Sequence, residues 1–133
     1  MTLKDRIKII PRRLIKDDRG WFFKAITGTE DNIPNHTGEV YLTMGKPGQI
    51  KGGHYRPEAV EWFTVIEGNA VLRLEDINSK ERIEIPMSLE DAKSVYVPNN
   101  VAHDFKNVGD TDFIVLAYTD KLYDPKDTIA YKL

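Results

Sequence analysis

Residues 48–68, GQIKGGHYRPEAVEWFTVIEG, contain the pattern that decides the fold class. Two glycines precede His54, and after the proline comes a short apolar run rich in β-branched and aromatic residues. In an alternating strand, Glu61, Phe63 and Val65 point to the same side, so one carboxylate enters an otherwise apolar face. A Glu-Gly pair then ends the run as a turn signal. The stretch therefore predicts a loop followed by a β-strand with a polar group on its buried face.

The rest of the chain repeats this short apolar pattern. Runs rich in Val, Ile, Phe, Tyr and Trp alternate with Gly, Pro, Asn and Asp turns, and no stretch of helix length has a convincing 3.6-residue period. The predicted strands are Ile7–Ile10, Trp21–Ile26, Val40–Met44, Val60–Ile66, Ala70–Leu74, Arg82–Ile85, Val95–Val97 and Phe113–Tyr118. About eight strands with almost no helix predict an all-β fold, either a sandwich or a barrel.

Size and composition exclude several classes of protein. The chain has 133 residues, close to the roughly 100–150 of a common domain, so we expect one domain over residues 1–133. Without cysteine there is no disulfide framework and no thiolate nucleophile or metal ligand. A formal net charge of −2 argues against nucleic acid as the main partner. Because no signal peptide or long apolar run is present, we expect a cytoplasmic protein that does not bind membranes.

The three histidines are the first candidates for chemistry, since histidine most often binds metals or moves protons near neutral pH. His36 lies in a polar turn stretch and is expected to be an exposed loop residue. His54 and His103 each follow a loop and open a predicted strand. A buried Glu61 would be costly unless it is paired with a basic residue of the next strand or bound to a cation. His54, Glu61 and His103 are therefore the residues of most interest.

The segments around these residues resemble the two motifs of the cupin superfamily. The residues that fit the motif spacing are Gly48, His54, Glu61, Gly68, Pro98, His103 and Asn107. The resemblance implies a single-domain, cupin-type antiparallel β-barrel (jelly roll) with the His and Glu side chains inside. Arg56 stands where the first motif has its second His, so one metal ligand is missing. A set of His54, Glu61 and His103 could still hold zinc or iron, because three protein ligands with an open position suffice.

Other segments resemble enzymes that act on nucleotide-linked 4-keto-6-deoxy sugars. Residues 17–22, DDRGWF, and 51–55, KGGHY, resemble the dTDP-4-dehydrorhamnose 3,5-epimerase family, in which the second segment carries the catalytic base. Residues 107–112 and 123–129 are similar to the cupin domain fused to capsular UDP-sugar reductases, and the second of these also to the dTDP-sugar 3,4-ketoisomerases. The similarities cover roughly residues 5–130. They imply a cofactor-free isomerase of cell-surface polysaccharide biosynthesis that forms a homodimer.

The resemblance also implies roles for single residues. His54 would be the base that removes the proton alpha to the ketone, with His103 beside it in the site. Lys51 or Arg56 would stabilise the enolate oxygen. Arg19 matches the diphosphate-binding Arg of the epimerase family, and a guanidinium suits phosphate.

Three tyrosines are candidates for the acid that returns the proton. Tyr118 is assigned to catalysis, and Tyr55 and Tyr123 to contact with the substrate. Two alternatives to the isomerase stay open: a metal-dependent cupin enzyme acting on another small molecule, and a non-catalytic cupin that binds a sugar nucleotide. The sequence leaves the choice between dTDP and UDP open.

Overall fold

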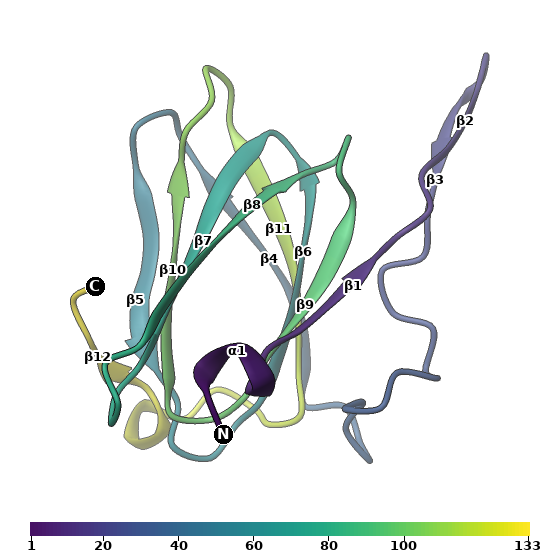
Figure 1. Cartoon of the computed structure of the whole chain (residues 1–133). Coiled ribbons are helices and arrows are strands. Elements are labelled where there is room, and N and C mark those ends of the chain that lie inside the picture. Colours follow the sequence, from purple (N-terminus) through teal and green to yellow (C-terminus); the bar gives the residue numbers. More distant parts are fainter.

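The computed structural model describes residues 1–133, and its strands form two facing antiparallel sheets (Figure 1). The elements are α1 (Leu3–Arg6), β1 (Lys8–Pro11), β2 (Ile15–Asp17), β3 (Gly20–Phe22), β4 (Glu39–Gly45), β5 (Ile50–Tyr55), β6 (Glu61–Glu67), β7 (Asn69–Asp76), β8 (Arg82–Ser88), β9 (Lys93–Val97), β10 (Val101–Asn107), β11 (Phe113–Thr119), the 3₁₀ turn η1 (Pro125–Asp127) and β12 (Ile129–Ala130). One sheet has the order β1-β9-β6-β11-β4 and the other β12-β5-β10-β7-β8. The predicted all-β, antiparallel architecture is confirmed.

The hydrophobic core lies unevenly between the two sheets. Its buried apolar side chains come from β6 to β11, with Leu3 and Ile7 packing on them from the N-terminal end. The alternation of side chains along a strand explains which residues are buried. In β11, for example, Val115 and Ala117 point inward while the residues that alternate with them are only partly buried. Strands β4 and β5 contribute no residue to this core. The hydrophobic core therefore does not fill the space between these two strands.

The sheet that contains β6 is covered on its outer face as well. Trp62 donates a hydrogen bond from its indole nitrogen to the carbonyl of Asn32 at 3.3 Å. Ser94 donates to the carbonyl of Ala25 at 2.6 Å, so the segment that follows β3 packs across β6 and β9. This cover buries both faces of β6 and fixes the strand that carries Glu61.

The predicted strands are found, with one shortened and others missed. The run Trp21–Ile26 is a strand only as far as Phe22, because the chain then turns to cover β6. Strands β5 and β10 are absent from the predicted runs, since a glycine pair and a His-Asp pair interrupt their apolar patterns, and His54 and His103 were expected to open strands after loops. In the structure, His54 lies near the end of β5 and His103 inside β10. Neither helical element is long and apolar enough to cross a membrane.

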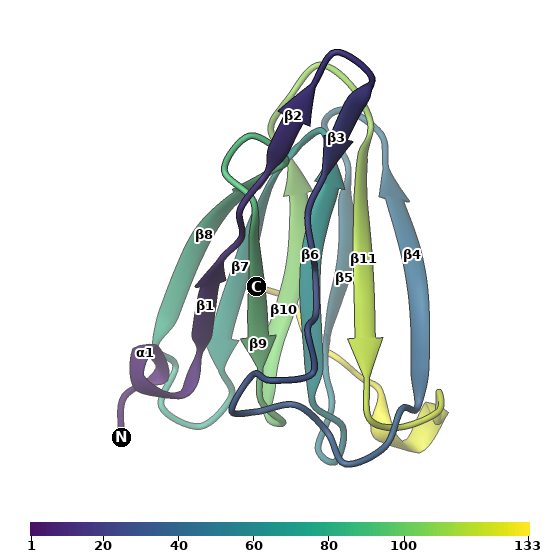
Figure 2. The ribbon, with the colours of Figure 1, turned by 90° about the vertical axis from the view of Figure 1, so that its right-hand side faces the viewer.

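Strands β2 and β3 form a separate hairpin that projects beyond the ends of the two sheets (Figures 1 and 2). All six of its strand residues are exposed, including Trp21 and Phe22. A two-stranded hairpin is marginally stable by itself in water. Its apolar side chains are thus available to another surface.

Candidate functional site

A β-bulge in β5 aims His54 into the space between the sheets. His103 of β10 pairs with His54, but the next residue of β10, Asp104, pairs with Gly52, so Gly53 has no partner in β10. Both glycines have positive φ values of 100° and 93°. A Cβ on Gly52 would lie 3.1 Å from the backbone of Asp104, closer than side chains normally pack. In this geometry the bulge formed by the two glycines directs the side chain of His54.

His103 is buried and its ring is oriented by the backbone. The ring nitrogen Nδ1 lies 3.4 Å from the carbonyl oxygen of Val101. A carbonyl only accepts hydrogen bonds, so this contact places a proton on Nδ1 and directs Nε2 toward Glu61. The rings of His54 and His103 meet edge to face with their centroids 4.9 Å apart. The two imidazoles therefore share one site.

Glu61 supplies the carboxylate of the site from the inner face of β6. Its side chain is buried, and its Oε2 accepts a 2.7 Å hydrogen bond from the hydroxyl of Tyr41. Its Oε1 lies 3.7 Å from Nε2 of His103. The carboxylate is thus matched by a phenol and an imidazole, rather than by a Lys or Arg of the neighbouring strand.

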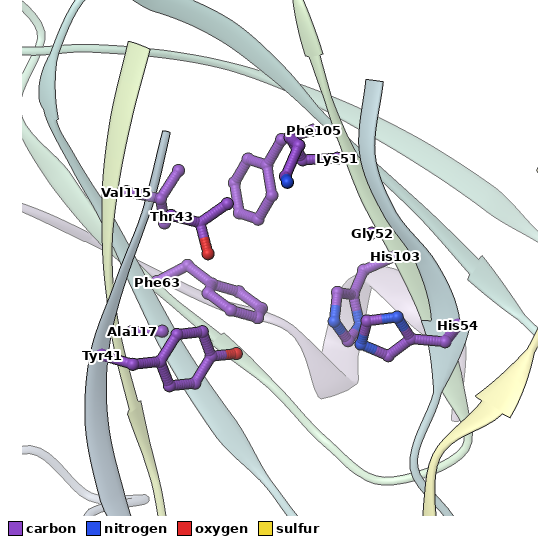
Figure 3. Close-up of a pocket in the computed structure, with 10 residues that line it drawn as sticks. All are labelled: Tyr41, Thr43, Lys51, Gly52, His54, Phe63, His103, Phe105, Val115 and Ala117. Carbon is purple, nitrogen blue, oxygen red and sulfur yellow. The ribbon is translucent and has the colours of Figure 1, made fainter. Parts of the chain in front are cut away.

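A pocket of about 220 Å³ opens between β4 and β5 above these residues (Figure 3). It is lined by Tyr41, Thr43, Lys51, Gly52, His54, Phe63, His103, Phe105, Val115 and Ala117. Figure 3 shows His54 and His103 on one wall and Tyr41 on the facing wall. The volume lies below the roughly 300–1,000 Å³ of pockets for drug-sized ligands, so it suits a single ring better than a whole nucleotide.

The environment favours a neutral imidazole at His54. Burial lowers its pKa below the ordinary 6.5, the nearby His103 and Arg56 lower it further, and Glu61 opposes the shift. The pKa of Tyr41 is raised by burial and by the adjacent Glu61, which keeps its phenol protonated. The pocket therefore holds a proton acceptor on one wall and a protonated phenol on the other.

The same residues fit a divalent metal ion. One ligand atom each from His54, Glu61 and His103 lies within 4.8 Å of the others. Two imidazoles and a carboxylate form a donor set that suits zinc or iron. The orientation of the His103 ring by Val101 agrees with such a role, since metal-bound histidines usually have their other nitrogen fixed by a carbonyl or carboxylate.

Arg56 lies outside the pocket lining and points into the protein. It is 7% exposed, its Nε lies 3.3 Å from Oδ2 of Asp127, and it also donates to the carbonyl of Leu122 and the hydroxyl of Thr119. Arg56, which stands where the cupin motif has its second histidine, thus forms an ion pair with the C-terminal part of the chain.

The other predicted substrate residues do not lie together at one place. Lys51 lines the pocket, as expected. Arg19 lies at the tip of the β2–β3 hairpin, where its exposed guanidinium pairs with Asp17. Tyr55 packs against Tyr131, away from the pocket lining, because it alternates with His54.

Tyr118 and Tyr123 are also outside the pocket lining. Tyr118 alternates with Ala117, so its side chain lies on the outer face of β11, where the hydroxyl contacts that of Thr37 at 3.3 Å. The predicted catalytic role of Tyr118 is therefore corrected, because strand alternation turns its side chain away from the pocket. Tyr123 is 66% exposed in the segment after β11.

Tyr41, the one tyrosine that lines the pocket, is not among the residues predicted from the sequence. Alternation along Val40–Met44 separated Tyr41 and Thr43 from the apolar residues, and the usual rule would put the apolar side inward. In the structure Val40 and Leu42 are 60% and 64% exposed, and the polar side faces the pocket. The polar side of β4 was the signal that could have identified this wall.

Solved structures and known proteins resemble this chain in fold and in sequence. It superposes on the dTDP-6-deoxy-D-glucose-3,5-epimerase RmlC of Legionella pneumophila with a TM-score of 0.84 and 18% identity, covering 97% of this chain and 74% of that one. This likeness confirms the RmlC-like cupin fold. The chain also resembles the capsular polysaccharide assembling protein CapF of Staphylococcus aureus, with a TM-score of 0.69 and 31% identity over 92% of this chain and 35% of CapF.

Two curated proteins are similar in sequence. The spore coat polysaccharide biosynthesis protein SpsL of Bacillus subtilis strain 168 is 28% identical over 128 residues, or 91% of this chain and 83% of SpsL. A UDP-2-acetamido-2,6-beta-L-arabino-hexul-4-ose reductase of Pseudomonas aeruginosa is 28% identical over 115 residues, or 86% of this chain but only 29% of the reductase. A family model described as the polysaccharide biosynthesis C-terminal domain matches residues 15–131. The chain therefore belongs to the polysaccharide biosynthesis C-terminal domain family.

Proposed function

We propose that the chain is an isomerase that epimerises or ketoisomerises a nucleotide-linked 4-keto-6-deoxy sugar during polysaccharide biosynthesis. The observation that carries the proposal is the imidazole of His54, held by burial in its neutral form and facing a ring-sized pocket with Lys51 at its wall. Family membership and the names of the relatives support a sugar-nucleotide substrate. No bound cofactor is needed for proton transfer of this kind.

In the proposed reaction, His54 takes the proton from the carbon next to the ketone. The electrons of the broken C–H bond form a C=C bond, and the ketone oxygen becomes an enolate oxygen. The ammonium group of Lys51 donates a hydrogen bond to this oxygen. A proton then returns to carbon, after which the proton donor takes a proton from solvent and His54 releases its proton to solvent. Epimerisation needs the donor on the opposite face from the base, and Tyr41 on the facing wall is the phenol in that position (Figure 3).

The nucleotide would lie outside the small pocket, and a second copy would complete its site. The projecting hairpin exposes Trp21 and Phe22, and β4 exposes Val40 and Leu42 on its outer face, so two copies have apolar surfaces to cover. We propose a homodimer in which Arg19 of the hairpin contacts the diphosphate of a dTDP or UDP sugar. A cytoplasmic location completes this proposal.

Exchange of the substrate proton with solvent tests the proposal. The chain is incubated in D₂O with dTDP-linked and, separately, UDP-linked 4-keto-6-deoxy sugars, and the sugar protons are followed by NMR. We expect the signal of one proton alpha to the ketone to disappear in at least one of the two substrates. Nucleotide binding without exchange in either substrate would contradict the isomerase and favour a non-catalytic sugar-nucleotide-binding cupin.

A second candidate is a metal-dependent cupin enzyme, favoured by the cluster of His54, Glu61 and His103. A bound divalent ion would polarise a carbonyl oxygen as a Lewis acid. Elemental analysis of protein purified without chelator, followed by titration of the apoprotein with Zn²⁺, tests it. Near-stoichiometric metal that is lost in Glu61→Gln would support this candidate. Absence of metal together with unchanged thermal stability in Zn²⁺ would overturn it, because binding to the folded state stabilises it.

A further inference from the structure

The segment after β11 returns to the strand that carries His54. Residues 120–131 turn beneath the barrel and run back beside β5 (Figure 1). Strand β12 pairs with β5 in antiparallel register, with Ile129 opposite Tyr55 and Ala130 opposite His54. The last part of the chain is therefore in direct backbone register with the candidate base.

This segment also forms a hydrogen bond with the bulge that directs His54 into the pocket. Gly53 has no partner in β10, and its carbonyl is bonded from the other side of β5. The backbone N–H of Tyr131 donates to that carbonyl at 2.8 Å. Because two adjacent glycines have more backbone freedom than other residues, a bulge built from Gly52 and Gly53 needs an external restraint to hold one conformation. The Tyr131 hydrogen bond supplies one.

A buried carboxylate anchors the segment to the same region. Asp127 is 5% exposed, and its two oxygens accept from the backbone N–H groups of Glu58 at 2.7 Å and Ala59 at 3.2 Å. Its Oδ2 pairs with Arg56, which directly follows β5, and the guanidinium also donates to the carbonyl of Asp127 at 3.4 Å. The anchor thus fixes the segment on the chain immediately after β5.

We propose that residues 124–131 form a clamp that fixes the orientation of the His54 imidazole, and that Asp127 is its anchor and hence a positioning residue. The clamp holds the bulge from outside through Tyr131 and holds the end of β5 through Asp127. The role of His54 as a base rests on the proposed function, whereas the order of its ring does not. The experiments therefore measure ring order and activity separately.

The hydrogen bond to the bulge is tested with a matched pair of variants, Tyr131→Pro and Tyr131→Ala. Both lose the tyrosine side chain, but only proline lacks the N–H that donates to Gly53. In Tyr131→Pro we expect the NMR signals of the His54 ring to broaden or split, and the amides of residues 53–55 to exchange roughly tenfold faster or more. His36, an exposed loop residue, should be unchanged in the same spectra.

The anchor is tested with Asp127→Asn against Asp76→Asn. Asp76 is a close match, because it is also buried, pairs with Arg6, and accepts from the backbone N–H groups of Asn78 and Ser79. In the deuterium exchange assay, Asp127→Asn should lower kcat by roughly 10- to 100-fold with little change in KM, as misplacement of a catalytic group does. Asp76→Asn should leave both constants unchanged.

Ring order decides the inference even where activity is absent. Sharp, unshifted His54 signals in both Tyr131→Pro and Asp127→Asn would overturn the clamp. If Asp127→Asn does not fold, the Tyr131 pair alone gives this answer. A wild type without exchange activity would count against the proposed function, while disordered His54 in Tyr131→Pro alone would still support the clamp.

Discussion

Glu61 and Asp127 are both buried carboxylates, but they have different partners. Asp127 is matched by the guanidinium of Arg56 and by two backbone N–H groups, and it lines no pocket. Glu61 meets the phenol of Tyr41 and the imidazole of His103, both of which line the pocket. A buried charge alone therefore does not mark a functional site. What distinguishes Glu61 is that its partners can exchange protons and face a cavity.

The largest expected effect on stability comes from breaking the ion pair of Arg56 and Asp127. Arg56→Gln leaves Asp127 buried without its cation and should lower the free energy of unfolding by about 3–5 kcal/mol, the usual cost of breaking a buried pair. Urea denaturation measures it. Arg82→Gln is the control, because the Arg82–Glu75 pair is more exposed and should contribute less than about 1 kcal/mol. Equal effects of the two variants would mean that Arg56 does not anchor the C-terminal segment.

A smaller loss of stability is expected when the hydrogen bond between Tyr41 and Glu61 is removed. Tyr41→Phe removes the hydroxyl that donates to Glu61 and should lower the free energy of unfolding by about 1.5 kcal/mol. This is the lower end for hydrogen bonds to charged groups, because Tyr41 is 37% exposed and water can replace it. In the proposed reaction the variant should still exchange the proton but form less epimerised product. Unaltered product ratios would remove Tyr41 from the proton-returning step.

A still smaller effect on stability is expected for Glu61→Gln. The amide keeps an acceptor for the hydroxyl of Tyr41 and removes a buried charge, so the free energy of unfolding should change by less than about 1 kcal/mol. Thermal denaturation beside Asp127→Asn compares the two carboxylates directly. A Glu61 variant that is as destabilised as the Asp127 variant would show that both centres are structural.

The smallest expected effect is the influence of the charge of Arg56 on the pKa of His54. His54 acts as a base only when neutral, so exchange should rise with pH through its pKa, which burial places below 6.5. Arg56 lowers that pKa further, so Arg56→Gln should raise it and move the midpoint of the pH–rate profile to higher pH. Exchange rates measured across the acid limb test this. A midpoint that moves to lower pH would contradict the sign of the interaction.

Most of the barrel could be predicted from local patterns, because runs such as Phe113–Tyr118 carry both a strand composition and an alternating face. Strand β5 could not, because its glycine bulge is stabilised by partners on β10 and by Tyr131, far away in the chain. The spacing of the cupin motifs grouped His54, Glu61 and His103, and these residues do lie together.

The pocket walls were harder to predict than its histidines. Alternation divides Tyr41 from Val40, and Tyr118 from Ala117, but the sequence does not say which side of a strand faces inward. In β4 the polar side faces in because the pocket lies there, and in β11 the small Ala117 faces in directly opposite Tyr41. The role of Arg56 was equally hidden, since Asp127 is distant in sequence.

In the proposed reaction a proton is abstracted in the pocket and His54 accepts it. Two variants with the same substitution test it most directly, His54→Asn in the pocket and His36→Asn in an exposed loop. Deuterium incorporation into the 4-keto sugar nucleotide should fall at least ~10²-fold in His54→Asn, the lower end of what general acid–base catalysis contributes, and stay at the wild-type rate in His36→Asn. Wild-type incorporation by a folded, nucleotide-binding His54→Asn would contradict the claim.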